Sequence, residues 1–130
     1  MVQHVKSEAT FALPGFSPAV ALPNGLVLIS GQVAIGLDGK IAGVGNFDAQ
    51  VDLTMTNLRE VLAAAGATFE QVVKLGIIVT DRKHVGRWRE LRSRYFHDPY
   101  PASTLIIAGL VSEELLIEVE AIAYVGSGSA

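Results

Sequence analysis

The sequence predicts an α+β fold, in which two helices cover one face of a β-sheet. Two observations support this fold class: short apolar, β-branched segments recur along the chain, and two amphipathic helical patterns separate them. The elements follow the order ββ(β)αβαββ, which is typical of helices packed on one side of a sheet. The 130 residues have the length of one domain, predicted over 1–125, and residues 126–130 are predicted to be a flexible tail.

The first third of the chain predicts a β-meander. Residues 26–30 form an apolar run directly after Pro23-Asn24-Gly25, a sequence that favours a turn. Residues 33–37 and 40–44 are two further short segments that flank Asp38-Gly39. An Asp-Gly pair favours a two-residue hairpin turn because both central positions of that turn take a positive φ. We therefore expect these two segments to pair as a hairpin.

A first helix is predicted over residues 47–65. Its apolar residues recur at steps of four and three, which places them on one helical stripe: Val51, Met55, Leu58, Leu62 and Ala65. Asn46 or Asp48 can cap the start of this helix. Gly66 occupies the position at which a left-handed residue commonly ends a helix.

The second half of the chain predicts a strand, a helix and two more strands. Residues 72–79 (VVKLGIIV) are β-branched and mostly apolar, as in a buried strand. Thr80-Asp81 can cap a second helix, which ends near His97 because proline at positions 99 and 101 cannot continue it. The apolar stripe of this helix is Val85, Trp88, Leu91 and Tyr95. Residues 104–110 and 115–124 are the last predicted strands.

The composition excludes several classes of protein. Hydrophobic residues make up 50% of the chain and charged residues only 18%, which excludes intrinsic disorder and indicates apolar surface buried between subunits. The net charge of −3 gives no general attraction for nucleic acid or an anionic membrane. Because the chain has no Cys, disulfides, thiolate metal ligands and thiol nucleophiles are excluded.

No targeting or membrane segment is expected. No stretch approaches ~18 consecutive apolar residues, the length of a membrane span. Lys6, Glu8, Pro14 and Pro18 interrupt the region where a signal peptide would be apolar. We therefore expect a cytoplasmic protein.

The usual motifs for metal, nucleotide or hydrolase chemistry are absent from the sequence. His4, His84 and His97 do not have the spacing of a metal site, and no carboxylate completes a metal-binding triad. The glycines form no GxGxxG pattern, no Walker A lysine is present, and Ser30 does not lie in a GxSxG elbow. We expect neither a metal nor a cofactor.

The basic residues are concentrated in the second helix. Six of the ten Lys and Arg residues lie there: Arg82, Lys83, Arg87, Arg89, Arg92 and Arg94. They could form a patch that binds an anion or RNA, or the solvated face of the helix with Glu90 and Asp81 as partners. The solvated face is favoured because no aromatic residues interleave with these charges and the chain as a whole is acidic.

Two carboxylates lie among apolar residues in the last predicted strand. Side chains alternate over residues 116–124, so that Glu118 and Glu120 lie on one face, opposite Ile117 and Val119. The two carboxylates belong either to a solvated strand face or to a cleft. In an apolar cleft a carboxyl has a raised pKa and can give a proton to a substrate. Spacing alone favours the solvated face.

Short pieces of the sequence resemble, in their order and spacing, those of one protein family. They are Gly15-Phe16-Ser17-Pro18-Ala19, Leu28-Ile29-Ser30-Gly31-Gln32, Asn57-Leu58, VLAAAGA (61–67), VVK (72–74), YF (95–96), PA (101–102) and IEVEAIA (117–123). On these residues, which span about 15–124, the chain resembles the Rid family of reactive intermediate deaminases, also called the YjgF or L-PSP family.

The resemblance implies a fold, an assembly and a reaction. The fold is a curved mixed sheet of about six strands backed by two helices, chorismate-mutase-like, and three subunits assemble as a trimeric barrel with ligand clefts between neighbours. Active family members hydrolyse imine or enamine products of PLP enzymes, such as 2-aminoacrylate, to keto acids and ammonia. They use no metal and no cofactor. We therefore expect a homotrimer with a small-molecule substrate at the subunit interfaces, and no nucleic-acid or membrane partner.

The resemblance also implies which residues line the cleft. Glu120, the second Glu of the last strand, would be the catalytic residue that positions the attacking water. Ser30 and Gly31 would contribute backbone groups to the cleft wall.

Several cleft positions depart from the family pattern. Ser103 stands where an Arg would bind the substrate carboxylate through two hydrogen bonds. Phe16 replaces a Tyr and so removes a hydroxyl group. Arg89 and Arg92 stand where an Asn and a Tyr are usual. The residues expected to bind substrate are Phe16, Ser30, Gly31, Arg89 and Ser103.

Two functions follow, and a third is disfavoured. The first is a deaminase whose substrate is shifted away from 2-aminoacrylate, with the substrate anion, where present, met by Ser103, backbone amides or Arg89. The alternative is a non-catalytic trimer that binds a small metabolite or regulates another protein, since Ser103 and Phe16 make the cleft smaller and less polar. An endoribonuclease is disfavoured by the acidic balance and by the absence of an aromatic stacking platform.

Overall fold

The structure, a computed structural model, describes residues 1–126 and contains a six-stranded mixed sheet. The strands are β1 (Gln3–Val5), β2 (Ala19–Ala21), β3 (Leu26–Gln32), β4 (Val72–Val79), β5 (Ala102–Ile107) and β6 (Ile117–Tyr124). Their order across the sheet is β1-β2-β3-β6-β4-β5. β4 and β5 are parallel, and all other neighbouring strands are antiparallel. The expected α+β fold is confirmed.

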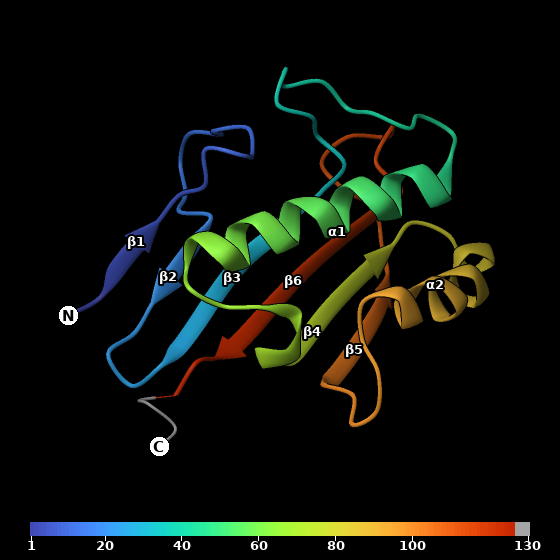
Figure 1. The fold of residues 1–130 in the computed structure, drawn as a ribbon. Helices are drawn as coiled ribbons and strands as arrows, with labels where there is room; N and C mark the ends of the chain where they lie inside the picture. Colours follow the sequence, from blue (N-terminus) through green and yellow to red (C-terminus); the bar gives the residue numbers. More distant parts are fainter. Residues whose placement is uncertain (127–130) are drawn as a thin grey trace.

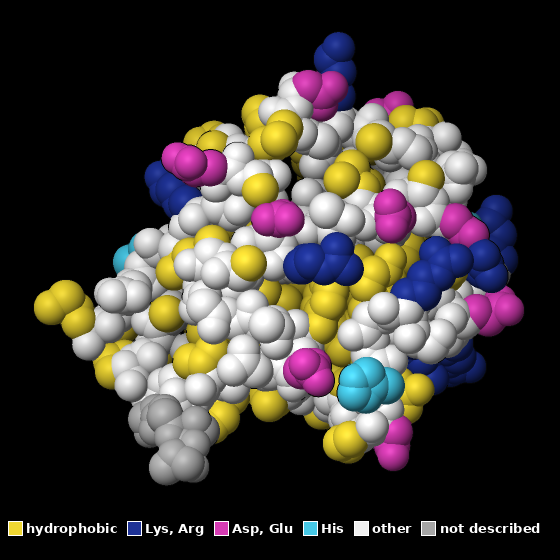
Figure 2. Space-filling view, in the orientation of Figure 1, with side chains coloured by type: hydrophobic (Ala, Val, Ile, Leu, Met, Phe, Trp, Pro, Cys, Tyr) yellow, Lys and Arg dark blue, Asp and Glu magenta, His cyan; other side chains and the backbone are white. Residues whose placement is uncertain are grey.

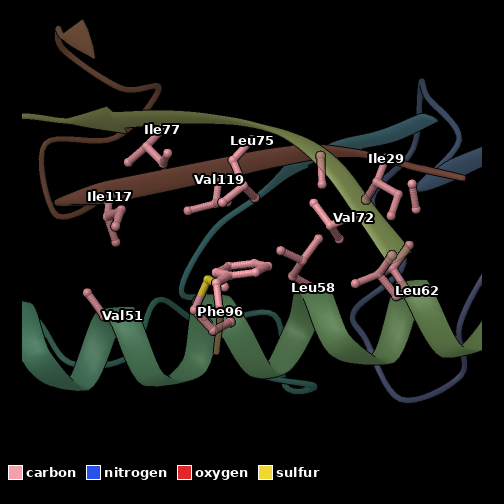
Figure 3. Close-up of a cluster of buried hydrophobic side chains, with 14 of the residues drawn as sticks. Ile29, Val51, Leu58, Leu62, Val72, Leu75, Ile77, Phe96, Ile117 and Val119 are labelled. Atoms are coloured by element: carbon pink, nitrogen blue, oxygen red, sulfur yellow. The ribbon is translucent and has the colours of Figure 1, made fainter. Parts of the chain in front are cut away.

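Two helices pack against the sheet and enclose the core. α1 (Phe47–Ala64) runs across β3, β6 and β4, and α2 (Val85–Leu91) lies beside β4 and β5 (Figure 1). Apolar side chains of α1 and of the facing strands interdigitate, with Phe96 between the two layers (Figure 3). The predicted stripe of α1 is buried at Val51, Met55, Leu58 and Leu62. Within residues 1–126, neither helix is long and apolar enough to span a bilayer.

Local polar contacts fix the ends of α1. The Asn46 side chain accepts a hydrogen bond of 3.0 Å from the Ala49 N–H, so Asn46 rather than Asp48 is the N-cap. Gly66 follows the helix with a φ of +80°, as expected for the residue that ends it. Asp48 instead forms an ion pair with Arg87 of α2, which ties the two helices together.

β6 is the central strand, and its alternating pattern is confirmed. Ile117, Val119, Ala121 and Ala123 point into the core and are at most 3% exposed. Glu118 and Glu120 therefore lie on the other face, which no helix covers. This open face of the sheet carries the candidate site.

The predicted hairpin over residues 33–44 forms only as a short one, and its turn is not the two-residue turn that the Asp-Gly pair predicts. Gly39 has a φ of +80°, but Asp38 has no positive φ. The Gly39 N–H instead donates to the Gly36 carbonyl at 2.9 Å, and the Gly36 N–H donates to the Lys40 carbonyl at 2.9 Å. The two segments pair through one isolated antiparallel bridge, Ile35 to Ile41, and through the Ala42 N–H, which donates to the Ala34 carbonyl at 2.9 Å. The Asn57 side-chain amide donates to the Val33 and Ile35 carbonyls at 2.9 and 3.0 Å, so α1 holds the backbone of the first segment, and neither segment joins the six-stranded sheet.

Other boundaries also differ from the predictions. The sequence did not predict β1 and β2, whose three residues each are too few to show a period. α2 ends at Leu91 and a 3₁₀ turn, Arg92–Arg94, follows it, so the helix is shorter than predicted. β5 begins directly after Pro101 and ends at Ile107. Of the predicted tail, residues 127–130 lie outside the described part of the chain.

Candidate functional site

Two adjoining cavities lie on the open face of the sheet. The first, of about 320 Å³, is lined by residues of β2, β3, β4 and β6 that include Ser30 and Leu28. The second, of about 280 Å³, is lined by residues of β4, β5 and β6 that include Glu118 and Thr104. Lys74, Gly76 and Glu120 line both cavities. These three residues are therefore the centre of the candidate site.

Each glutamate of β6 lies over a glycine of a neighbouring strand. Glu120 is paired with Gly76 across β6 and β4, and a Cβ at Gly76 would lie 2.9 Å from Glu120 Cγ. A Cβ at Gly31 of β3 would likewise collide with the Glu118 carboxylate. A glycine inside a strand often marks such a close approach. Gly31 and Gly76 thus provide the space in which the two carboxylates lie.

A β-bulge in β3 stands opposite Glu120. The ladder pairs Ile29 with Ala121 and Gln32 with Val119, so the two residues Ser30 and Gly31 oppose a single residue of β6. The Ser30 hydroxyl donates to the Ser17 carbonyl at 2.7 Å, and the Ser30 N–H donates to the Pro18 carbonyl at 2.9 Å. Ser30 therefore shapes the cavity wall, and its hydroxyl hydrogen is engaged with the backbone.

Burial and charge distinguish the two carboxylates. Burial, and then the charge of Glu120, raise the pKa of the half-buried Glu118. Glu120 is exposed to the cavity. Lys74 adds a positive charge on the same wall, and its ammonium lies 3.4 Å from the Thr104 hydroxyl. Such a site can hold a proton on one carboxyl while the other binds water or a cationic substrate.

Two of the expected substrate contacts lie next to this centre. Phe16 and Gly31 line a narrow cavity of about 40 Å³ together with Phe11 and Asn57. Phe16 is 48% exposed. Its neighbour Ser17 accepts the Ser30 hydrogen bond, so this segment lies against the bulge. The structure thus brings Phe16, Ser30, Gly31 and Glu120 to neighbouring parts of the sheet.

Ser103 and Arg89 lie elsewhere. Ser103 pairs with Leu75, whose side chain is in the core, so Ser103 faces the helix side of the sheet, away from Glu120. It lines a cavity of about 210 Å³ with Arg92 of the 3₁₀ turn. Arg89 is exposed and does not line that cavity. A single chain therefore does not bring Ser103 or Arg89 together with Glu120.

The basic residues of the second helix mostly form a solvated face, as the sequence favoured. Lys and Arg side chains gather over α2 with acidic residues between them (Figure 2). Arg87 contacts Asp48 at 2.6 Å and Glu90 at 3.7 Å. Asp81 accepts the Lys83 backbone N–H at 2.8 Å and caps the turn that precedes α2. The expected partner Glu90 is confirmed, whereas the main partner, Asp48, was not foreseen.

Lys74 and Gly76 were not predicted as site residues. Both interrupt the apolar run of β4, and a charge and a glycine inside a buried strand could have indicated the site. Among residues 1–126, no three His, Asp or Glu side chains gather closely enough to hold a metal ion.

Comparison with known proteins places this geometry in a family. The family model described as Endoribonuclease L-PSP matches residues 7–125. The protein mmf2, mitochondrial, of Schizosaccharomyces pombe is 39% identical over 103 residues, which are 77% of this chain and 80% of that protein. Its name places that relative in mitochondria, and the cytoplasmic address of this chain stays a prediction.

Solved structures agree with this assignment. A putative endoribonuclease L-PSP from Entamoeba histolytica is 31% identical, with a TM-score of 0.86 over 96% of this chain and 100% of that one. RidA from the Antarctic bacterium Psychrobacter sp. PAMC 21119 is 26% identical, with a TM-score of 0.86 over 95% of this chain and 98% of that one. The sequence pieces, the fold and these matches agree, and the chain belongs to the Rid family, also known as the endoribonuclease L-PSP or YjgF family.

Proposed function

We propose that this chain is a Rid-type hydrolase that deaminates reactive imine or enamine intermediates to carbonyl compounds and ammonia, with a substrate shifted away from 2-aminoacrylate. The position of Glu120 carries the proposal. Its carboxylate lies on the wall of an open cavity, flanked by the Ser30–Gly31 bulge on one side and Gly76 on the other. Family membership supports a role of this kind.

Hydrolysis of an imine needs a group near Glu120 that can accept a proton and give it back. An enamine first takes a proton on carbon and becomes an iminium ion. Glu120 accepts a proton from water while the water oxygen bonds to the iminium carbon and the C=N π electrons move to nitrogen. Return of that proton to nitrogen makes the amine a leaving group. As the C–N bond breaks, the hydroxyl oxygen forms the C=O bond and gives its proton to Glu120, so that ammonia and the carbonyl compound leave. One water is consumed for each ammonia released.

The proposal includes a homotrimer with clefts between subunits. Apolar side chains remain uncovered on the open face in a single chain: Leu28 is 40% exposed and Ile106 is 53% exposed. In the trimer the cleft would join Glu120 of one subunit to the Ser103 edge of its partner. The measurement is analytical ultracentrifugation of the full chain, which is expected to give three times the mass of one chain. A monomer would contradict this part of the proposal.

The activity test measures ammonia. Imines of several amino acids are generated in the cuvette by a flavin-dependent amino acid oxidase, and ammonia release is followed with and without the protein. Glu120→Gln is expected to reduce the enzymatic rate by roughly 100-fold or more, the usual contribution of a positioned base. Glu113→Gln, an exposed carboxylate outside both cavities, is the matched control. Full turnover by Glu120→Gln would remove Glu120 from the mechanism.

The same assay distinguishes the alternative, a trimer that binds a small metabolite without turning it over. Ser103, a small residue on the edge strand β5, supports that alternative. If no imine is turned over by the wild type and Ser103→Arg creates activity, the native protein is a binder. Cleavage of RNA is not part of the proposal because a net charge of −3 gives no general attraction for a polyanion. A cytoplasmic location is part of it, and fractionation of the source cells tests that location.

A further inference from the structure

The cavity beside Ser103 has an apolar floor and a polar rim. Trp88, Phe96 and Leu75 form the floor and are at most 5% exposed. The rim carries Arg92 and Ser103. A volume of about 210 Å³ lies below the range of drug-sized pockets, so it suits a metabolite of few heavy atoms.

Arg92 is oriented but carries no ion pair. Its guanidinium lies 5.7 Å from the ring centroid of the exposed Tyr100, and the side chain is half-buried. Within residues 1–126 the ion pairs involve Arg87, and Arg92 joins none of them. A guanidinium that stacks on a ring keeps its N–H edge free, and that edge matches a carboxylate through two hydrogen bonds.

The residue at position 103 leaves room for that contact. Ser103 and Arg92 line the same cavity, so a long side chain at position 103 would compete with Arg92 for its volume. No Asp or Glu is among the residues that line this cavity. Lys74, the cation of the open face, instead shares its cavity with Glu118 and Glu120, whose negative charges disfavour an anion there.

We propose that Arg92 is the anion-binding residue of this chain and that the cavity it shares with Ser103 takes a small carboxylate with a short apolar chain, such as a 2-keto acid or the corresponding imine. The proposal rests on the function proposed above, because it states that the imine substrate of the deaminase carries a carboxylate. Arg92 provides the positive charge from the 3₁₀ turn after α2, and Trp88 and Phe96 contact the apolar chain.

The test measures equilibrium binding, with no turnover, of pyruvate and of the neutral pyruvamide by NMR titration of the full chain. Arg92→Gln is expected to weaken pyruvate binding by roughly 30- to 100-fold and to leave pyruvamide binding unchanged. Arg92→Lys keeps the charge but not the bidentate geometry and is expected to lose less. Arg94→Gln, an exposed residue of the same 3₁₀ turn outside the cavity, is the matched control and is expected to bind as the wild type does.

Three results would overturn the proposal: no saturable pyruvate binding by the wild type, equal losses for both ligands in Arg92→Gln, or a loss that follows Lys74→Met instead. Thermal melting of each variant shows whether it is folded, and Arg92→Lys provides a folded comparison if Arg92→Gln unfolds. Pyruvate binding that depends on Arg92, with no ammonia released from any imine, would refute the deaminase and leave the anion site standing. Ammonia release that is insensitive to Arg92→Gln would support the deaminase and refute the anion site.

Discussion

Glu120 and Gly76 face each other across β6 and β4 so closely that a single methyl group on Gly76 would meet the glutamate side chain. A Cβ there would lie 2.9 Å from Glu120 Cγ and 3.0 Å from Oε1. Because Cγ is the nearest atom, the contact is relieved only by rotation about the Cα–Cβ bond of Glu120, which moves the whole carboxylate. The glycine therefore determines where the carboxylate lies more than whether the sheet forms.

Gly76→Ala is expected to impair turnover more than stability. Displacing Glu120 by about 1 Å should reduce imine hydrolysis by roughly 100-fold, while the free energy of unfolding falls by about 1 kcal/mol or less. Ammonia release and thermal melting measure the two effects. Gly86→Ala is the matched control, since nothing lies within 4 Å of a Cβ there and alanine favours the helix by up to about 1 kcal/mol. Equal activity in both variants would contradict the role of Gly76.

Gly31→Ala is expected to destabilise the fold through Glu118. The new methyl group collides with the half-buried Glu118 carboxylate, at a cost of about 1–3 kcal/mol in the free energy of unfolding. In a Glu118→Ala background that cost should largely disappear, because the colliding atoms are gone. Urea denaturation of the four proteins in this double-mutant cycle gives the coupling energy. A coupling energy near zero would show that the cost comes from the backbone of the bulge instead.

Glu118 should make stability depend on pH in a defined direction. Burial, and then the charge of Glu120, raise the pKa of Glu118 in the folded chain. A protonated carboxyl carries no such penalty. As pH rises from the pKa of the unfolded state through the raised pKa of the folded state, the carboxyl ionises and the free energy of unfolding falls. Glu118→Gln is therefore expected to be more stable than the wild type at pH 7 and equal to it near pH 3.

The stability gain of Glu118→Gln is expected to be small, and Glu113→Gln is its control. Because Glu118 is only half-buried, solvent screening limits the gain to about 1 kcal/mol or less. Glu113→Gln removes the same charge at an exposed position and is expected to change stability by the same small amount at both pH values. Thermal melts at pH 3, 5 and 7 test the prediction. A gain that is largest at the lowest pH would have the wrong sign.

Asn57 is expected to hold the short hairpin over residues 33–44 against α1. Asn57→Ala removes two hydrogen bonds to the Val33 and Ile35 carbonyls and should cost about 1–3 kcal/mol in the free energy of unfolding. Hydrogen exchange should rise over residues 33–42. Thr54→Val in the same helix is the contrast: its buried hydroxyl has no partner within the described chain, so its removal should be neutral or stabilising. A destabilised Thr54→Val would indicate a partner for that hydroxyl in the assembly.

Much of the fold could be predicted because burial imposes a period on the sequence. α1 and β6 showed theirs clearly, since one face of each is wholly buried. The short extent of the hairpin over 33–44 could not be predicted, because a distant side chain, Asn57, binds the Val33 and Ile35 carbonyls. Such long-range hydrogen bonds leave no mark on local sequence.

The candidate site was only partly predictable, for a similar reason. Glu120 and Ser30 came from the resemblance, and their proximity is a consequence of strand order. The orientations of Arg89 and Arg92 could not be deduced from a helical period. α2 ends at Leu91, and each residue of the following 3₁₀ turn rotates the chain by more than in an α-helix, so the direction of Arg92 does not follow from the helical period.

The bulge at Ser30–Gly31 also determines the direction of the side chain that follows it, Gln32. Leu28 and Ser30 line the open face, and by simple alternation Gln32 would join them; the extra residue instead turns Gln32 inward opposite Val119, where it is 9% exposed. A deletion of one residue here would restore simple alternation and turn Gln32, the last residue of β3, toward the open face. Chain length at this point therefore decides whether a polar amide lies in the core or on the open face.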